Sequence, residues 1–190
     1  PTNAQKRAVT EAIEDMKTNK QMNRLLQGDV GSGKTAVAAA IMYNAVKNGF
    51  QSALMAPTEV LANQHFKTLL NFFGDDINIE LLTGSVTAGK KKIIREKLKS
   101  GECDIVVGTH AIIQNDVEFD NLGLVITDEQ HRFGVGQRAT LSGKGNNPHT
   151  IVMSATPIPR TLAMMIYGDL DISVLDELPK GRQPIKTYHV

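Results

Sequence analysis

The sequence RLLQGDVGSGKT, residues 24–35, decides the fold, because a short apolar run is followed by a glycine-rich loop and then by the start of a helix. The loop GDVGSGKT satisfies the spacing of a P-loop in the strand–loop–helix context that this motif requires. Its glycines let backbone N–H groups and the helix N-terminus surround phosphate oxygens. The alternative is an ordinary glycine-rich turn with a solvated lysine.

The side chains of this loop predict contacts with a nucleoside triphosphate. Lys34 would reach the β- and γ-phosphates, and the Thr35 hydroxyl would bind Mg²⁺. The expected cofactors are therefore ATP and Mg²⁺. The predicted nucleotide-binding residues of the loop are Gly28, Gly31, Ser32, Gly33, Lys34 and Thr35.

Strands alternate with helices on both sides of this loop. We predict strands at 24–28, 52–57, 77–82, 104–109, 123–128 and 150–155, and helices at 4–16, 34–48, 59–73 and 87–100. This alternation is typical of an α/β fold with a doubly wound, mostly parallel sheet and helices on both faces. Ligands of such sheets bind beyond the carboxyl ends of the strands. We therefore expect one functional rim there.

The apolar run LVIT ends on two adjacent carboxylates, Asp128 and Glu129. Solvation at a strand end would explain such a pair without any chemistry. However, a P-loop on the same sheet needs a second Mg²⁺ ligand and a group that orients the attacking water. We predict that Asp128 holds the metal through its water shell and that Glu129 acts as a general base.

Composition describes an ordinary globular chain of 190 residues with 41% hydrophobic residues and a net charge of +1. The near-neutral charge neither demands nor excludes a nucleic-acid partner. Cys103 is the single cysteine, and we expect it to be a buried hydrophobe rather than a catalytic thiol. No apolar run has the length of a membrane span and no signal peptide opens the chain, so we expect a cytoplasmic protein.

Four further motifs carry a family resemblance. DEQH (128–131) and SATPIPRT (154–161), after a P-loop, resemble the first RecA-like motor lobe of superfamily 2 helicases. Within them, DEQHRFGVGQR (128–138) and GDLDISVLDELP (168–179) resemble RecG-type helicases, which are ATP-dependent DNA translocases that remodel stalled forks and branched junctions. Mfd-type transcription-repair coupling translocases share HRFG and ATPIPRT. They usually carry an aromatic residue in place of Ser32 and Glu in place of Gln130, so the sequence sides with the RecG type.

The resemblance implies roles for further residues. Gln5 matches a glutamine that reads adenine, although its spacing from Thr2 also fits a helix capping box. The segments 56–59, 83–85 and 108–110 match loops that touch a DNA backbone, with Pro57, Thr58, Thr83, Gly84, Thr109 and His110 as the implied contacts. Catalysis would involve Lys34, Asp128, Glu129 and His131. Coupling between nucleotide state and DNA grip would involve Gln130, His131, Ser154, Thr156 and Arg160, where Arg160 touches either phosphate or a carboxylate.

The resemblance also implies the surroundings of this lobe. Residues 1–168 would form the lobe, and 169–190 a lobe-end strand and a linker toward a second motor lobe. The full-length chain would add an N-terminal wedge domain, bind branched or forked DNA in the bacterial cytoplasm near the nucleoid, and have no membrane contact. The absence of an initiator methionine favours a piece of a longer protein. Such a piece would be nearly inactive alone, because the ATP site of these motors lies between two lobes.

Three alternatives remain open in the sequence. The chain could be the motor lobe of an Mfd-type translocase, or a non-catalytic nucleotide-binding module. The lysine-rich helix KKKIIREKLK (90–99) could also bind nucleic acid. We interpret its lysines as the solvated side of a helix whose other side carries Ile93, Ile94 and Leu98.

Overall fold

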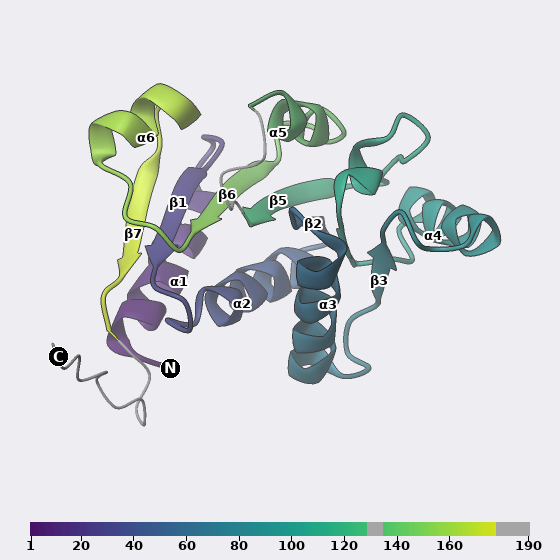
Figure 1. The fold of residues 1–190 in the computed structure, drawn as a ribbon, viewed down its shortest axis with the longest axis horizontal. Coiled ribbons are helices and arrows are strands. Elements are labelled where there is room, and N and C mark those ends of the chain that lie inside the picture. The colour runs from purple at the N-terminus through teal and green to yellow at the C-terminus, as the bar shows by residue number, and fades with distance from the viewer. Residues whose placement is uncertain (129–134, 178–190) are drawn as a thin grey trace, which may run out of the picture.

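The computed structural model describes residues 1–128 and 135–177, which form a seven-stranded sheet with helices on both faces (Figure 1). All paired strands are parallel, in the order β3-β4-β2-β5-β6-β1-β7. The strands are β1 Asn23–Gly28, β2 Gln51–Met55, β3 Ile79–Leu82, β4 Ile105–Gly108, β5 Leu122–Asp128, β6 His149–Ser154 and β7 Asp171–Leu175. The predicted fold class is confirmed.

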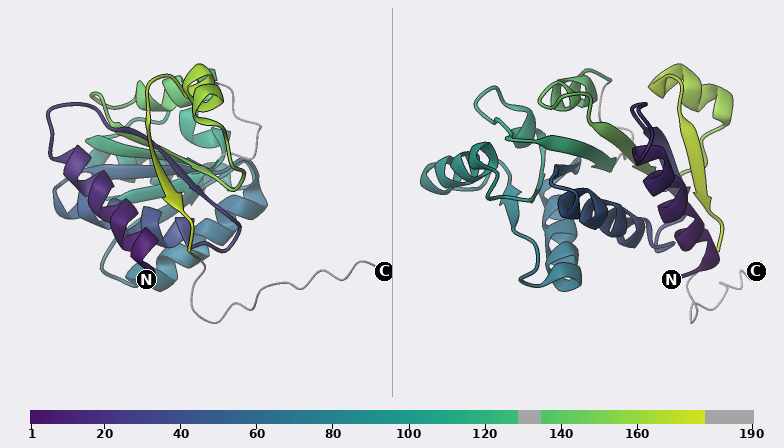
Figure 2. Two further views of the ribbon diagram at one scale, coloured as in Figure 1. Left: turned by 90° about the vertical axis from the view of Figure 1, so that its left-hand side faces the viewer. Right: turned by 180° about the vertical axis from the view of Figure 1, so that it is seen from behind.

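Helices cover the two faces of this sheet in two groups, visible when the sheet is seen nearly edge-on (Figure 2). The first face packs against α1 Asn3–Met16, α2 Lys34–Lys47 and α3 Glu59–Phe73. The second face packs against α4 Ala88–Ser100, the 3₁₀ helix η1 His110–Ile113, α5 Val135–Ser142 and α6 Arg160–Tyr167. Neighbouring strand residues therefore belong to different cores, which explains why the strands are apolar without alternation.

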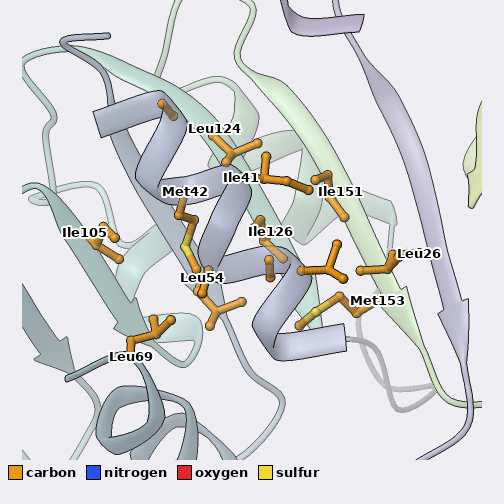
Figure 3. Close-up of a cluster of buried hydrophobic side chains, with 14 of the residues drawn as sticks. Leu26, Ile41, Met42, Leu54, Leu69, Ile105, Leu124, Ile126, Ile151 and Met153 are labelled. Atoms are coloured by element: carbon orange, nitrogen blue, oxygen red, sulfur yellow. The ribbon is translucent and has the colours of Figure 1, made fainter. Parts of the chain in front are cut away.

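The larger core lies between α2 and the middle of the sheet. Figure 3 shows Ile41 and Met42 of α2 among the strand residues Leu54, Ile126 and Ile151. All five side chains are essentially inaccessible to water. Burial of each such side chain stabilises the fold by about 1.5–3 kcal/mol, so α2 and the loop that precedes it are held firmly on β1, β5 and β6.

Threonines cap three of the described helices. Thr2 and Gln5 form a complete capping box at the start of α1. The Thr58 hydroxyl accepts a hydrogen bond from Leu61 N at 3.2 Å, and Thr87 caps α4 through Lys90 N. These bonds satisfy donors that the first turn of a helix leaves free.

The structure adds elements that the sequence patterns did not indicate. The helices α5 and α6 have eight residues each, and η1 has four. Elements this short present too few turns for an apolar period to be recognised. The predicted lobe-end strand corresponds to β7, which pairs with β1, whereas the rest of the predicted linker lies largely in 178–190, outside the described residues.

The apolar side of α4 is narrower than predicted. Ile94 and Leu98 are buried, but Ile93 is 53% exposed, so its assignment to that side was wrong. Residues 94 and 98 are four apart and share a helix face, whereas residue 93 lies 100° away from residue 94. The lysines of α4 surround this narrow stripe. Among the described helices, none is both long and apolar enough to cross a membrane.

Cys103 is fully buried beside β4, as predicted. Burial, together with the negative charges of Glu80 and Asp104, raises the pKa of its thiol from 9.0 to about 12. Since the thiolate is the reactive form, the folded protein should protect this residue from alkylation.

We expect iodoacetamide at pH 8 to label Cys103 only after denaturant is added, as read by peptide mass spectrometry. The pKa is higher in the folded state than in the unfolded state. As the pH rises from the pKa of the unfolded chain to that of the folded protein, loss of the thiol proton favours the unfolded chain. The free energy of unfolding should therefore fall by about 1.4 kcal/mol per pH unit in this range, and the thiol should have no effect on it at lower pH. Equal labelling rates with and without denaturant would contradict this account.

Candidate functional site

Three strand ends meet at the carboxyl edge of the sheet. β6 lies between β1 and β5, and the register pairs Gln27 with Ser154 and Asp128 with Met153. The P-loop, Ser154 and Asp128 therefore follow one another along this edge, as the arrowheads of β1, β6 and β5 show in Figure 1. The sequence-predicted nucleotide site is thus built by one sheet edge.

Two glycines of the P-loop cannot be replaced without displacing neighbours. A Cβ on Gly28 would lie 2.5 Å from Ser32 Oγ and 2.9 Å from Leu175 Cβ. Gly33 has φ +89°, and a Cβ there would lie 2.1 Å from Gln5 Nε2. The glycines therefore serve close approach and a left-handed backbone, as the motif predicts.

The start of α2 presents donors toward the loop. Gly33 is the N-cap and makes no side-chain cap bond, and Val37 N donates the first helical bond to Gly33 O at 3.1 Å. The N–H groups of the first turn have no carbonyl four residues earlier within the helix. Ser32 Oγ is buried and has no hydrogen-bond partner among the described residues. A helix N-terminus beside an unsatisfied buried hydroxyl fits a phosphate group.

Lys34 lies folded onto the loop that carries it. Its Nζ donates to the carbonyl oxygens of Gly28 at 2.5 Å and Asp29 at 2.9 Å. Burial lowers the pKa of Lys34, and the nearby negative charges of Asp128 and Asp29 oppose this shift. The charge of Asp128 therefore acts on the lysine ammonium, which lies over the loop.

Gln5 joins α1 to the P-loop. Its Oε1 accepts from Thr2 N at 2.9 Å within the capping box, and its Nε2 donates to Ser32 O at 2.9 Å. Both ends of the amide are engaged in this structure. An adenine contact, which the resemblance implies, would replace one of these bonds.

Asp128 closes β5 with a side chain that is only 17% exposed, and its Oδ2 lies 2.6 Å from His65 Nε2 on α3. Within the described part of the chain, no group of three His, Cys, Asp or Glu residues could hold a metal ion. Mg²⁺ commonly binds through one or two protein ligands, substrate phosphates and water. Asp128 and Thr35, which is the second residue of α2, fit that mode.

The coupling residues are only partly described. Ser154 ends β6, and its Oγ donates to Thr156 O at 3.1 Å and accepts from Thr156 N at 3.3 Å, which makes a compact turn. Arg160 is exposed at the first residue of α6. Glu129, Gln130 and His131 lie outside the described residues, so their predicted roles have no structural counterpart here.

The predicted DNA loops lie at the ends of β2, β3 and β4, and Glu59 links two of them. Its Oε1 accepts from Ser85 N at 3.0 Å, and hydrogen bonds from Ser85, followed by Gly84, lower the pKa of Glu59. Lys91 Nζ donates to Gly84 O at 2.9 Å. These bonds fix the loop 83–85 to the start of α3 and to the first turn of α4.

Exposure separates the six implied DNA contacts. Thr58, Gly84 and His110 are exposed and Pro57 is half-buried, whereas Thr83 and Thr109 are only 1% and 4% exposed. The hydroxyls of Thr83 and Ser85 lie 3.1 Å apart and hydrogen-bond each other. A DNA backbone could therefore reach the first four residues directly, while Thr83 and Thr109 lie beneath the surface.

Sequence reasoning did not identify His65. It occupies a helix position on the same side as Ala62 and Leu69, and all three are buried. A lone histidine at such a position is indistinguishable from a core residue in the sequence. Only the packing of α3 against the sheet places it beside Asp128.

Comparisons with known proteins point to one family. The DEAD/DEAH box helicase family matches residues 2–165. ATP-dependent DNA helicase RecG of Streptococcus pneumoniae is 55% identical over 186 residues, which are 98% of this chain and 28% of that protein. RecG of Bacillus subtilis is 56% identical over 190 residues, which are 100% of this chain and 28% of that protein. The chain thus spans about a quarter of the length of these curated relatives.

Solved structures give the same result. A structure of RecG bound to a three-way DNA junction matches with a TM-score of 0.84 and 51% identity, covering 97% of this chain and 25% of that one. A DEAD box protein from Methanococcus jannaschii shares the fold alone, with a TM-score of 0.68 and 24% identity over 93% of this chain and 50% of that one. The resemblance to RecG-type helicases is confirmed.

Proposed function

The chain belongs to the DEAD/DEAH box helicase family, and we propose that it is the ATP-binding motor lobe of a DNA helicase. The full-length protein would use ATP hydrolysis to migrate branches at stalled replication forks and recombination junctions. Relatives named RecG, similar along the whole chain, support this proposal.

One observation carries the nucleotide part of the proposal. The buried Ser32 hydroxyl lacks a partner among the described residues, just before α2, and the neighbouring Lys34 ammonium lies over the loop, where the charge of Asp128 acts on it. A cation, free donors and a carboxylate at one sheet edge are the groups that a magnesium–triphosphate complex needs. An ordinary glycine-rich turn does not require these three groups.

Each residue of this site has a proposed role. Lys34 contacts the β- and γ-phosphates, and the backbone N–H groups of Gly31 and Gly33 surround phosphate oxygens. Thr35 and Asp128 would hold Mg²⁺, which neutralises phosphate charge when bound. Glu129 accepts a proton from the attacking water, and Gln5 contacts adenine.

The coupling proposal rests on strand order. The turn from Ser154 to Thr156 follows β6, which separates the strand of the P-loop from the strand of Asp128. A displacement at the end of β1 or of β5 would therefore reach this turn. We propose that changes in nucleotide state are transmitted to the DNA-binding loops by the predicted coupling residues Gln130, His131, Ser154, Thr156 and Arg160.

The proposed DNA contacts are made by the rim loops. Small hydroxyl residues and exposed N–H groups suit phosphate contacts that read no bases. The exposed Thr58, Gly84 and His110 would touch the DNA backbone, and the buried Thr83 and Thr109 would shape the loops beneath them. A second motor lobe and an N-terminal wedge domain of the full-length chain would complete the binding site, in the cytoplasm where a bacterial chromosome lies.

DNA binding by the full-length protein should be independent of sequence and should weaken as salt rises. If about four phosphates are contacted, raising the salt from 50 to 200 mM should lower the affinity by about 10²-fold. Fluorescence titration of forks with two unrelated sequences measures both properties. Tight, sequence-selective binding that survives high salt would contradict the proposal.

Branch migration of a synthetic fork tests the proposed activity. The full-length protein should convert a labelled fork to its migrated products with ATP and Mg²⁺, but not with a non-hydrolysable ATP analogue. The Lys34→Ala variant should give no products with either nucleotide. Product formation without hydrolysis would overturn the proposal.

A further inference from the structure

A buried histidine contacts the proposed metal ligand directly. His65 lies in the second turn of α3, is 9% exposed, and places Nε2 2.6 Å from Asp128 Oδ2. The two residues are 63 positions apart and come from a helix and from a strand end. No role assigned above to the P-loop, the coupling turn or the DNA loops uses this contact.

The chemistry of the pair fixes the direction of the bond. An ionised carboxylate can only accept hydrogen bonds, so His65 donates from Nε2–H. A buried hydrogen bond to a charged group is short and strong compared with one between neutral groups. It restricts the rotation of the Asp128 side chain, which otherwise turns about two bonds.

The helix that carries His65 is itself anchored near the site. Thr58 caps the start of α3, and Glu59 accepts a hydrogen bond from Ser85 in the loop after β3. Further along, Ala62 and Leu69 hold the same helix face in the core. His65 is therefore a fixed point against which Asp128 can be oriented.

We infer that His65 is a positioning residue that orients the Asp128 carboxylate for Mg²⁺. It touches neither nucleotide nor metal and acts through the carboxylate. Removal of a residue that hydrogen-bonds a metal ligand typically lowers metal affinity by about 10–100-fold. This inference rests on the proposed nucleotide site, because it presupposes that Asp128 serves the metal.

The test is the Mg²⁺ dependence of fluorescent ATP-analogue binding by the full-length protein. His65→Leu removes the donor, and His65→Asn keeps an amide that is too short to reach Oδ2. His65→Gln can place an amide N–H close to the position of Nε2. We expect the Mg²⁺ midpoint to rise by about 10–100-fold in the Leu and Asn variants and to return toward the parent value in the Gln variant.

Two controls separate positioning from packing. Nucleotide binding in EDTA should be unchanged by all His65 variants. His149 is a matched control, because its Nδ1 accepts a hydrogen bond from Met22 N at 2.9 Å at the start of β6. His149→Leu should lower the melting temperature and leave the Mg²⁺ midpoint unchanged. If His65→Leu does not fold, His65→Asn carries the test.

Asp128→Ala distinguishes a failure of the proposed metal site from a failure of the positioning role of His65. A raised Mg²⁺ midpoint in Asp128→Ala together with parent midpoints in folded His65→Leu and His65→Asn would overturn the role of His65 alone. A parent midpoint in Asp128→Ala would overturn the metal site and the positioning role with it. Rescue by Gln, with losses in Leu and Asn, is the result that supports the inference.

Discussion

Lys34→Ala in the full-length protein should reduce the rate of ATP hydrolysis by about 10²–10³-fold, which is the typical cost of removing one donor aimed at developing negative charge. Lys34 belongs to the P-loop, and its ammonium group donates to the carbonyls of Gly28 and Asp29. Phosphate oxygens would replace those carbonyls as acceptors. Nucleotide binding should weaken as well, by about 10–10²-fold, since a hydrogen bond to a charged group is lost.

Steady-state hydrolysis and calorimetry measure these two effects. The matched control is Lys47→Ala, because Lys47 lies on the same helix and pairs with Asp76 at the surface, 3.2 Å away. An exposed ion pair contributes little to stability, and this one has no part in the proposed site. Parent-like binding and hydrolysis by Lys34→Ala would show that GSGKT is a turn without a nucleotide.

Glu129→Gln should lower turnover by about 10²-fold or more while nucleotide still binds. Glutamine keeps the size and the hydrogen-bonding groups of glutamate but cannot accept the proton of the attacking water. Asp128→Ala should act differently, by weakening the Mg²⁺ dependence of binding. The two adjacent carboxylates are thereby separated into a base and a metal ligand.

Fork-stimulated hydrolysis, paired with fluorescent-nucleotide binding, measures this separation. Glu118→Gln provides the matched control, because Glu118 pairs with Lys99 at the surface, 3.1 Å away. That variant should hydrolyse ATP at the parent rate. A loss of nucleotide binding in Glu129→Gln equal to its loss of turnover would contradict a purely catalytic role.

The parts that the sequence predicted are those encoded locally. A P-loop brings its own strand, loop and helix, so the position of Lys34 at the start of α2 follows from spacing alone. The apolar strands were recognisable because both of their faces are buried, as Leu25 and Leu26 show in β1. The capping box of Thr2 and Gln5 likewise depends only on residues three positions apart.

The parts that the sequence missed depend on distant contacts. His65 meets Asp128 only because the fold brings α3 beside the end of β5, 63 positions away in the sequence. Thr83 and Thr109 match a DNA-binding pattern, yet packing around them makes both side chains inaccessible. In the sequence, Gln5 fits both a helix cap and an adenine contact. The structure adds a bond to Ser32 O that neither interpretation contained.

The central claim is that this lobe couples ATP hydrolysis to DNA through the edge formed by Lys34 and the two carboxylates. The most direct test is the steady-state ATPase rate of the full-length protein with and without forked DNA, for the parent and for Glu129→Gln. We predict that forked DNA stimulates the parent and that Glu129→Gln removes most of the stimulated rate. An ATPase rate indifferent to DNA, or a Glu129→Gln variant that hydrolyses ATP as fast as the parent, would contradict the claim.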